Sequence, residues 1–177
     1  MLRKLSLFLA IFCMMAGSGC QSRKDDGFAI YLLARDIPPA AVSQTHIDRL
    51  VLESKPIISG DDIVSYEKTD HALVLTQTAY GRVQQLFPMS VGVYGLPFVV
   101  CVGKERIYTG AFWTPISSLS YDGVVIMQPF EAQGTTVQIV LGYPSPDFFK
   151  GNDPRADARI MKVLEQAGKL KSIRFRV

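Results

Sequence analysis

Short apolar runs, bounded by glycine, proline and small polar residues, recur along the chain and predict β-strands. The clearest pair is PFVVCV at residues 97–102 and RIYTGAF at residues 106–112, which a turn at residues 103–105 separates. This arrangement predicts a β-hairpin. Further strands are predicted over residues 28–33, the second half of 45–52, 64–66, 71–75, 124–127, 135–141 and 172–177.

One segment in the middle of the chain has the periodicity of an amphipathic helix. Ala79, Val83 and Leu86 recur at spacings of four and three residues. Residues on one helix face follow this spacing, so a helix is predicted over about residues 77–87.

A second helix is predicted near the C-terminus, over about residues 154–167. Asp153 is a suitable N-cap, Pro154 fits the first helical position, and Gly168 fits a C-terminal cap. Many strands and two principal helices together predict an α+β fold with a mainly antiparallel sheet.

The first 19 residues have the layout of a secretory signal. Arg3 and Lys4 form a basic region, residues 5–15 are apolar apart from one serine, and residues 16–19 are small. The alternative is a transmembrane anchor, but a span needs about 20 apolar residues, and this run is shorter.

Cys20 follows the small residues directly. Ser18, Gly19 and Cys20 resemble the bacterial lipobox, although Gly17 stands where that motif has leucine or another aliphatic residue. The resemblance implies that Cys20 carries a diacylglycerol and becomes the new N-terminus. Two or more acyl chains give a stable membrane anchor where a single chain does not.

The predicted domain organisation follows from this processing. Residues 1–19 are the signal peptide, residues 20–27 a lipidated tether, and residues 28–177 a single α+β domain. Gln21 is not the aspartate that resembles an inner-membrane retention signal. The protein is therefore expected to face the periplasm or the cell exterior, on the outer membrane if the host has two.

Charge and cysteine content narrow the classes of function. The chain has 19 basic and 16 acidic residues, and the basic excess falls once Arg3 and Lys4 leave with the signal. This balance does not suggest nucleic-acid binding. Of three cysteines, only Cys101 would stay in the domain as a thiol, so no intramolecular disulfide is expected. Its apolar neighbours predict a core residue rather than a reactive nucleophile.

Motifs for catalysis or metal binding are absent from the sequence. There is no G-x-S-x-G, H-E-x-x-H, C-x-x-C, P-loop or G-x-G-x-x-G pattern, so no cofactor, metal ion or catalytic residue is assigned. His46 and His71 are interpreted as turn or strand-end residues.

Acidic residues offer the one catalytic alternative. The adjacent Asp61 and Asp62 fit the start of a short helical turn, which Ser59 or Asp61 would cap, better than an acid/base pair. An envelope hydrolase remains possible if Asp61 converges in the fold with Asp122 or Glu105.

The segment GAFWTPISSLSY at residues 110–121 is the candidate binding site. It joins large aromatic rings to small hydroxyl side chains, a combination suited to recognition surfaces. The candidate residues are Phe112, Trp113, Ser117, Ser118 and Tyr121. The alternative is that Trp113 closes one end of the core while the serines satisfy the turn backbone. A small-ligand pocket lined by Tyr31, Tyr66 or Tyr108 is a further possibility.

Three stretches, PIISGDDIVSY, HALVLTQTAYGRVQQL and GLPFVVCVGKERIYTGAF, occur in this order along the chain. Within residues 28–115 they resemble the first periplasmic domain of the protein-export subunit SecD. The resemblance implies an α+β, non-catalytic domain that engages exported polypeptide, and it transfers no catalytic residue. Residues 116–177 are not covered, and the chain lacks the transmembrane bundle of that subunit. The whole chain also resembles an uncharacterised bacterial lipoprotein family sharing the GAFW-x-P-x-SS segment.

The sequence thus predicts a lipid-anchored binding or accessory protein of the cell envelope without catalytic activity. The expected partners are the membrane, through the N-terminal lipid, and another envelope protein or an exported polypeptide. The envelope hydrolase is the alternative.

Overall fold

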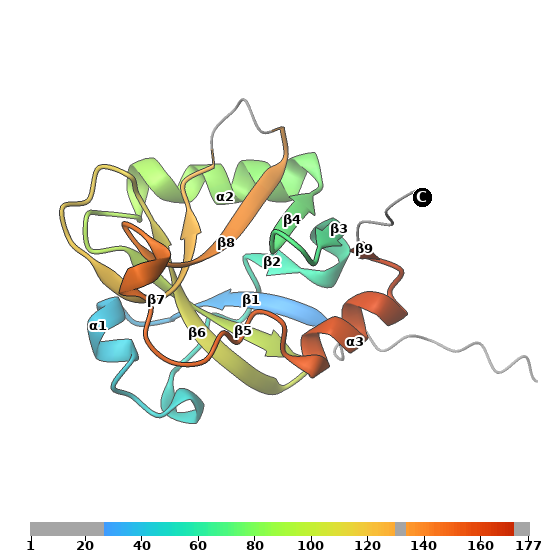
Figure 1. Ribbon diagram of the computed structural model, residues 1–177, viewed down its shortest axis with the longest axis horizontal. Coiled ribbons are helices and arrows are strands. Elements are labelled where there is room, and N and C mark those ends of the chain that lie inside the picture. Colours follow the sequence, from blue (N-terminus) through green and yellow to red (C-terminus); the bar gives the residue numbers. More distant parts are fainter. Residues whose placement is uncertain (1–26, 130–133, 172–177) are drawn as a thin grey trace, which may run out of the picture.

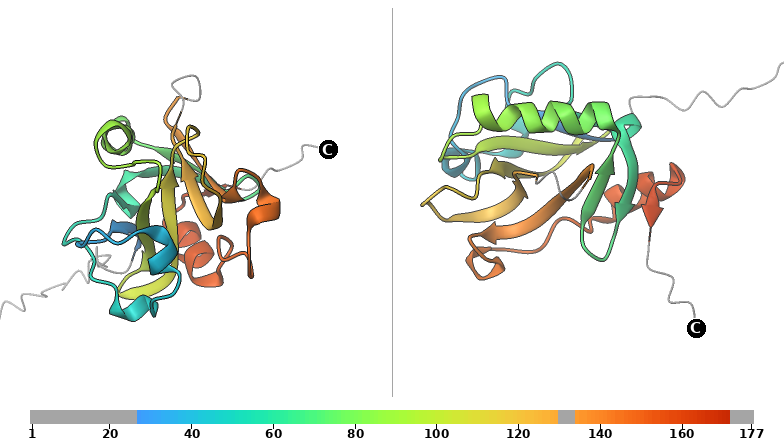
Figure 2. Two further views of the ribbon diagram at one scale, coloured as in Figure 1. Left: turned by 90° about the vertical axis from the view of Figure 1, so that its left-hand side faces the viewer. Right: turned by 90° about the horizontal axis from the view of Figure 1, so that it is seen from above.

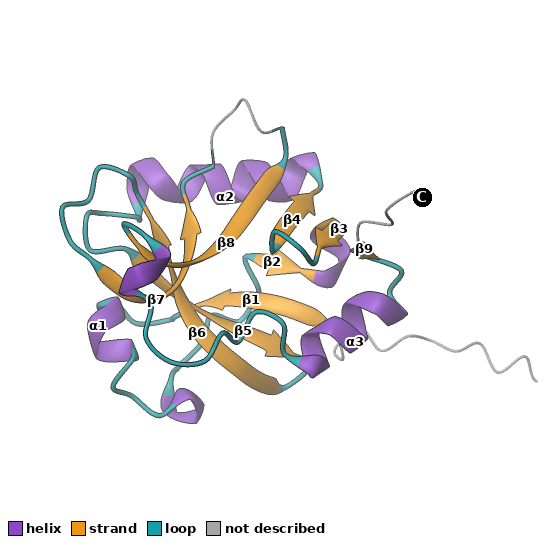
Figure 3. Ribbon diagram, in the orientation of Figure 1, coloured by secondary structure: helices purple, strands orange, loops and turns teal. Residues whose placement is uncertain are grey.

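A computed structural model describes residues 27–129 and 134–171 as an α+β domain with a large mixed sheet (Figures 1 and 3). The predicted signal peptide, Cys20 and the strand over residues 172–177 lie outside the described residues. In the described ranges, no helix is long and apolar enough to cross a membrane.

Nine strands and three α-helices make up the described domain. The strands are β1 (Phe28–Leu32), β2 (Ile58–Ser59), β3 (Ile63–Glu67), β4 (Ala72–Leu75), β5 (Leu96–Val102), β6 (Glu105–Trp113), β7 (Tyr121–Met127), β8 (Thr136–Tyr143) and β9 (Leu170–Lys171). The helices are α1 (Pro39–Val42), α2 (Gln77–Met89) and α3 (Ala158–Gln166), with 3-10 turns η2 (Ile47–Arg49), η3 (Gly60–Asp62) and η5 (Pro146–Phe148).

The strand order is β2-β1-β5-β6-β7-β8-β4-β3-β9, and most neighbours are antiparallel. The prediction of a mainly antiparallel sheet is therefore confirmed, with two exceptions. β6 pairs with β7 in parallel, as does β3 with β9. The predicted hairpin is present as β5 and β6, which pair from Leu96 opposite Phe112 to Val102 opposite Glu105.

The main core fills the inside of the curved sheet, which α2 and α3 cover (Figure 2). α2 begins where its periodicity predicts, because the Thr76 side chain accepts a hydrogen bond from the Ala79 N–H and caps the helix. Two smaller clusters lie on other surfaces of the sheet. One packs beneath the chain segment between β1 and β2, and the other is built around Trp113 and Tyr121.

The C-terminal helix starts later than predicted, at Ala158 rather than Pro154. Asp157 is the N-cap, with its carboxylate accepting from the Arg159 N–H at 2.9 Å. Asp153 instead accepts two hydrogen bonds from the Arg155 guanidinium, so a turn precedes the helix. The predicted end is confirmed, because Gly168 has φ +67° and ends the helix at the expected place.

The predicted strand in the second half of residues 45–52 is present only at its end. The 3-10 turn η2 extends to Arg49. Leu52 forms a bridge with Leu33, and the Ala34 and Glu53 N–H groups donate to the Val51 and Leu32 carbonyl oxygens at 2.9 Å each. The strand is shortened by a long-range contact, in which Arg106 Nη1 donates to the carbonyl oxygens of Ile47 and Leu50 at 2.5 and 2.7 Å. These bonds hold the backbone in a turn that the local apolar pattern does not reveal.

Substitutions at two glycines test the described packing, one in the tightly packed sheet and one on an open face of α2. A Cβ at Gly110 would lie 2.4 Å from the Phe98 ring and 2.7 Å from the Val124 carbonyl oxygen, so Gly110→Ala should destabilise the domain by about 1–3 kcal/mol. A Cβ at Gly81, inside α2, would meet nothing within 4 Å, so Gly81→Ala should stabilise by about 0.5–1 kcal/mol. Urea unfolding of both variants measures these changes, and equal effects of one sign would contradict the described packing.

Candidate functional site

The segment chosen from the sequence as a binding site is mostly interior. Phe112, Trp113, Ser117 and Tyr121 are buried, and only Ser118 is exposed. The prediction that these aromatic rings form a contact surface therefore does not hold. The alternative prediction, in which Trp113 closes one end of the core, agrees with its burial.

Trp113 is the centre of an aromatic cluster. Its ring stacks on Tyr121 with centroids 5.2 Å apart, and Tyr143 lies at 5.8 Å. On another side the ring meets Gly95, where a Cβ would lie 2.4 Å from it. Gly95 also has φ +77°, a backbone conformation that glycine adopts without strain. The loop between α2 and β5 can therefore lie directly against the tryptophan.

Side-chain hydrogen bonds hold the loop that follows Trp113. The Ser117 hydroxyl donates to the Val93 carbonyl oxygen at 2.6 Å and so joins this loop to the one between α2 and β5. The Tyr143 hydroxyl lies 3.0 Å from the carbonyl oxygen of Pro115 and 3.1 Å from that of Ser117. The serine and tyrosine satisfy backbone groups, which fixes the two loops in one arrangement.

What these loops expose is mainly apolar: three aliphatic side chains and one tyrosine. Val93, Tyr94, Ile116 and Leu119 have exposed fractions of 43%, 68%, 81% and 41%. We call these four residues the apolar end. The loops lie together at the end of the domain opposite the start of β1 (Figures 1 and 2). Exposed apolar groups gathered on one surface typically mark an interaction site.

The sequence analysis missed Ile116 and Leu119, although a signal for them was present. Residues 83–103 and 107–121 contain no charged side chain, and the apolar end lies in these two stretches. Protein interfaces are depleted of charge at their centre, so two uncharged stretches of this length are a usable indication.

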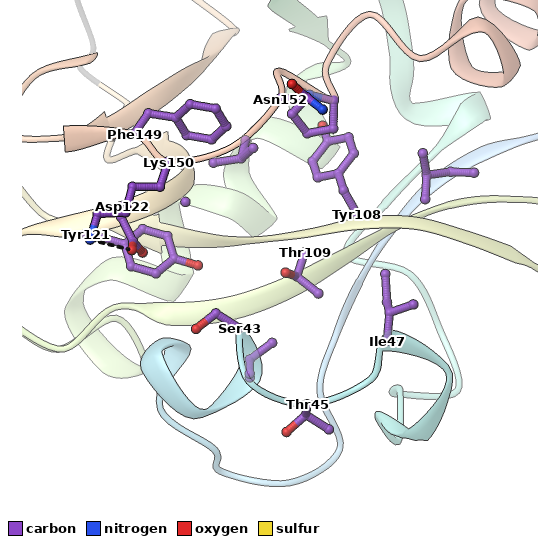
Figure 4. A pocket seen from close by; sticks show the side chains of 15 residues that line it. Ser43, Thr45, Ile47, Tyr108, Thr109, Tyr121, Asp122, Phe149, Lys150 and Asn152 are labelled. Atoms are coloured by element: carbon purple, nitrogen blue, oxygen red, sulfur yellow. Dashed lines mark ion pairs between the residues drawn. The ribbon is translucent and has the colours of Figure 1, made fainter. Parts of the chain in front are cut away.

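A second feature is an open cleft of about 480 Å³ beside β6 (Figure 4). We call it the β6 cleft. Its walls come from three parts of the chain: residues 42–47 at and after the end of α1, residues 107–109 of β6 with 121–124 of β7, and residues 149–154 between η5 and α3. The cleft continues toward Ser120, next to Leu119 of the apolar end.

Specific contacts hold the cleft walls in place. Arg106 fixes residues 47–50 to β6 through the two carbonyl contacts described above. On the other side the Lys150 N–H donates to the Asp122 carbonyl oxygen at 3.0 Å, and the two side chains form an ion pair at 3.8 Å. Both side chains are well exposed, so this pair contributes little stability. The backbone bond is what ties the wall to β7.

Two tyrosines line the cleft, and both stay protonated at physiological pH. Burial, with a smaller effect from the Asp122 charge, raises the pKa of Tyr121 to about 12. Burial likewise raises the pKa of Tyr108 well above its ordinary value. The phenol groups can therefore donate or accept hydrogen bonds in the cleft but do not supply a base.

Tyr66 and His71 form a polar contact behind the cleft, with the Tyr66 hydroxyl 2.6 Å from His71 Nδ1. Burial raises the pKa of Tyr66, so its hydroxyl stays protonated at neutral pH, and the histidine tautomer sets which of the two groups donates. Burial, together with the Arg155 charge, lowers the pKa of His71. Arg155 itself donates to the Ile139 carbonyl oxygen at 2.8 Å. The Tyr66 hydroxyl also lies 3.4 Å from the Arg155 carbonyl oxygen and so joins β3 to the segment before α3. His71 lies in the turn between β3 and β4, in agreement with its prediction as a turn residue.

The acidic residues proposed for a hydrolase do not converge. Asp122 lines the β6 cleft, whereas neither Asp61 nor Glu105 does. Glu105 instead binds Arg159. Asp61 belongs to η3, and its neighbour Asp62 accepts two hydrogen bonds from Ser59, at 2.8 Å each. The prediction of a short capped turn at these residues is confirmed.

The remaining candidates for chemistry have structural surroundings. Cys101 is buried between sheet and loop, and this burial raises the pKa of its thiol. Within residues 27–129 and 134–171, no three His, Cys, Asp or Glu side chains are placed to hold a metal ion. Of the predicted ligand-pocket tyrosines, Tyr108 lines the β6 cleft, while Tyr31 and Tyr66 do not.

Comparison of the chain with protein families, with curated proteins and with solved structures finds no match. The apolar end and the β6 cleft are therefore assessed by their chemistry. Both offer groups for noncovalent binding: aliphatic side chains and one tyrosine at the apolar end, and phenol, hydroxyl and amide groups in the cleft.

The fluorescence of the sole tryptophan, Trp113, tests whether its ring is buried in the aromatic cluster. Trp113 is 2% exposed, so its fluorescence emission should be blue-shifted and strongly protected from acrylamide in the folded protein. Unfolding in urea should shift the emission to the red and remove the protection. A folded-state emission equal to that of free N-acetyltryptophanamide would contradict the burial of the ring.

The lowered pKa of His71 predicts a pH dependence of stability. The unfolded chain binds the proton at a higher pH than the folded one, so the free energy of unfolding should fall as the pH drops below about 6.5. Urea unfolding between about pH 7.5 and about pH 5.5 measures the decrease. His71→Asn should reduce it, because asparagine tolerates the positive φ of this position but does not titrate.

His46→Asn is the matched control, since His46 is exposed. This variant should keep the decrease of the unchanged protein. An equal pH dependence in His71→Asn and the unchanged protein would show that His71 is not the titrating group.

Proposed function

We propose that this chain is an exported lipoprotein whose domain is a non-catalytic binding or accessory module of the cell envelope. Its partner is another envelope protein or an exported polypeptide. The chain is held at the membrane through lipid on Cys20, on the outer membrane where the host has two. The basic, apolar and small-residue regions of residues 1–19, followed directly by Cys20, support the export and the anchor.

The apolar end is the observation that carries the proposed binding role. Ile116 and Leu119 are held outward by a loop that is fixed at Ser117, whose hydroxyl donates to the Val93 carbonyl oxygen and whose carbonyl oxygen accepts from the Tyr143 hydroxyl. A preorganised surface loses less conformational entropy on binding than a flexible one does. A protein partner with an uncharged apolar surface fits it, because no charged residue of these loops would have to be desolvated.

The direction in which the apolar end faces also supports a partner other than the anchoring membrane. In the antiparallel pairing of β1 and β5, Phe28 lies opposite Val102, whereas Leu32 lies opposite Phe98. The chain therefore enters the domain at the Val102 end of β5, and the apolar end follows the opposite end of that strand. A lipid attached at Cys20 would leave the apolar end facing away from the entry point of the chain.

The resemblance of residues 28–115 to the first periplasmic domain of SecD supports the same class of function, since that domain engages exported polypeptide. The family of lipoproteins sharing the GAFW-x-P-x-SS segment is compatible with it. In this chain the segment supplies the buried Trp113 and Ser117 that support the apolar end.

Crosslinking in bacterial cells that express the full chain tests the binding role. A photoreactive amino acid at position 118, which is exposed beside Ile116 and Leu119, should capture a polypeptide that mass spectrometry identifies. Ile116→Ser with Leu119→Ser should weaken the affinity of the purified partner about tenfold or more, because apolar residues at the centre of an interface carry most of its binding energy.

Val51→Ser with Val64→Ser is the matched control, since both valines are exposed apolar residues on other parts of the domain. This pair should leave the affinity unchanged. Equal affinity of the Ile116/Leu119 pair and the control would exclude the apolar end as the contact. Cys20→Ala should move the protein out of the membrane fraction, and persistence there would contradict the lipid anchor.

A further inference from the structure

β6 has strand partners on both sides over only part of its length. β5 pairs with it between Glu105 and Phe112, but the parallel ladder to β7 covers only Gly110–Trp113. In the part of the chain that the structure describes, residues 105–109 have no strand partner on the β7 side. Alternate residues of a strand direct their N–H and C=O groups to each side, so this edge presents unpaired backbone groups.

A bulge in β7 leaves this edge open. The register between β7 and β8 shifts between Tyr121 and Val124. A Cβ at Gly123 would lie 2.6 Å from the Tyr121 ring, so the ring folds back over the glycine. The first residues of β7 therefore turn away from β6 instead of continuing the ladder. Bulges of this kind occur next to functional sites, where they end pairing.

The β6 cleft lies along the unpaired edge. Ile107, Tyr108 and Thr109 line it, and residues 149–154 form the facing wall (Figure 4). No backbone hydrogen bond joins that wall to residues 105–109 within the described ranges. The cleft therefore separates the edge from the segment that covers it.

Tyr108 gives the cleft a polar group. Its side chain lines the cleft and is 7% exposed. Its hydroxyl has no hydrogen-bond partner among the described residues and is not cut off from solvent. It is therefore free to bond with an occupant of the cleft.

We propose that the β6 cleft binds a short polypeptide segment in extended conformation, which adds as a strand to the free edge at residues 107–109. The backbone of the segment pairs with β6 and supplies most of the affinity, as in other cases of strand addition. Side chains of such a segment alternate in direction. One set meets the apolar and phenolic wall of Tyr108, Val124 and Phe149, and the other meets the hydroxyl groups of Ser43 and Thr45.

This proposal is independent of the apolar end. Its experiment uses the full chain, labelled with ¹⁵N and purified in detergent micelles, and an uncharged pentapeptide of alternating threonine and valine with blocked termini. The peptide should shift the backbone amide signals of Ile107 and Thr109 and, near saturation, slow their hydrogen exchange about tenfold or more.

Two N-methylated peptides identify backbone pairing. One is methylated at the valine nitrogens and the other at the threonine nitrogens. Only one set of N–H groups can face β6, so one peptide should bind about tenfold weaker than the parent and the other within about threefold. Equal binding of both peptides, or no shift at Ile107 and Thr109, would overturn the proposal.

Variants place the peptide in the cleft. Ser43 is exposed on the cleft wall, so Ser43→Trp should block binding, whereas Ser54→Trp, at an exposed serine outside the cleft, should retain it. Unchanged binding to Ser43→Trp would overturn the location. Ile116→Ser with Leu119→Ser should bind the peptide normally. Loss of the cellular partner in that variant tests the apolar end, whereas loss of the peptide in Ser43→Trp tests the β6 cleft.

Discussion

The parallel ladder between β6 and β7 is the contact on which the rest of the domain depends. It is short, from Gly110 to Trp113, and it is close, because Gly110 has no side chain between Phe98 and Val124. It joins the half of the sheet that contains β1 and β5 to the half that contains β8, β4 and β3. Because β7 is parallel to β6, the chain must return over the sheet between them. The returning loop covers Trp113 and carries Ile116 and Leu119 outward.

Both candidate surfaces follow from this single crossover. Where the ladder is present, its C-terminal end supports the aromatic cluster and the apolar end. Where the ladder is absent, the unpaired part of β6 becomes one side of the β6 cleft. The bulge at Gly123 separates the two regions. A continuous β6–β7 ladder would have closed the cleft and left the sheet with no free edge at its centre.

The features that local physics determines could be predicted from the sequence. The hairpin of β5 and β6, the start of α2 at Thr76 and the end of α3 at Gly168 each depend on neighbouring residues alone. The features that were missed depend on distant partners. Arg106 holds residues 47–50 in and after η2 and so shortens a predicted strand, and Asp153 binds Arg155 instead of capping α3. The candidate residues named from the sequence lie in the same loop as part of the apolar end but are mostly buried, because burial of an aromatic ring depends on distant partners such as Tyr143 and Gly95.

The strand order also has a consequence for how the chain folds. Three ladders, β3–β4, β5–β6 and β7–β8, join strands that are close in sequence, and such hairpins form within microseconds. The ladder between β4 and β8 instead joins residues 72–74 to residues 136–138, across most of the domain. Closing a loop of this length has an entropic cost that must be met before the contacts form. The hairpins can therefore assemble early, whereas the core between them becomes complete only when β4 reaches β8. A chain truncated before β8 would retain the β3–β4 and β5–β6 hairpins but could not enclose the core.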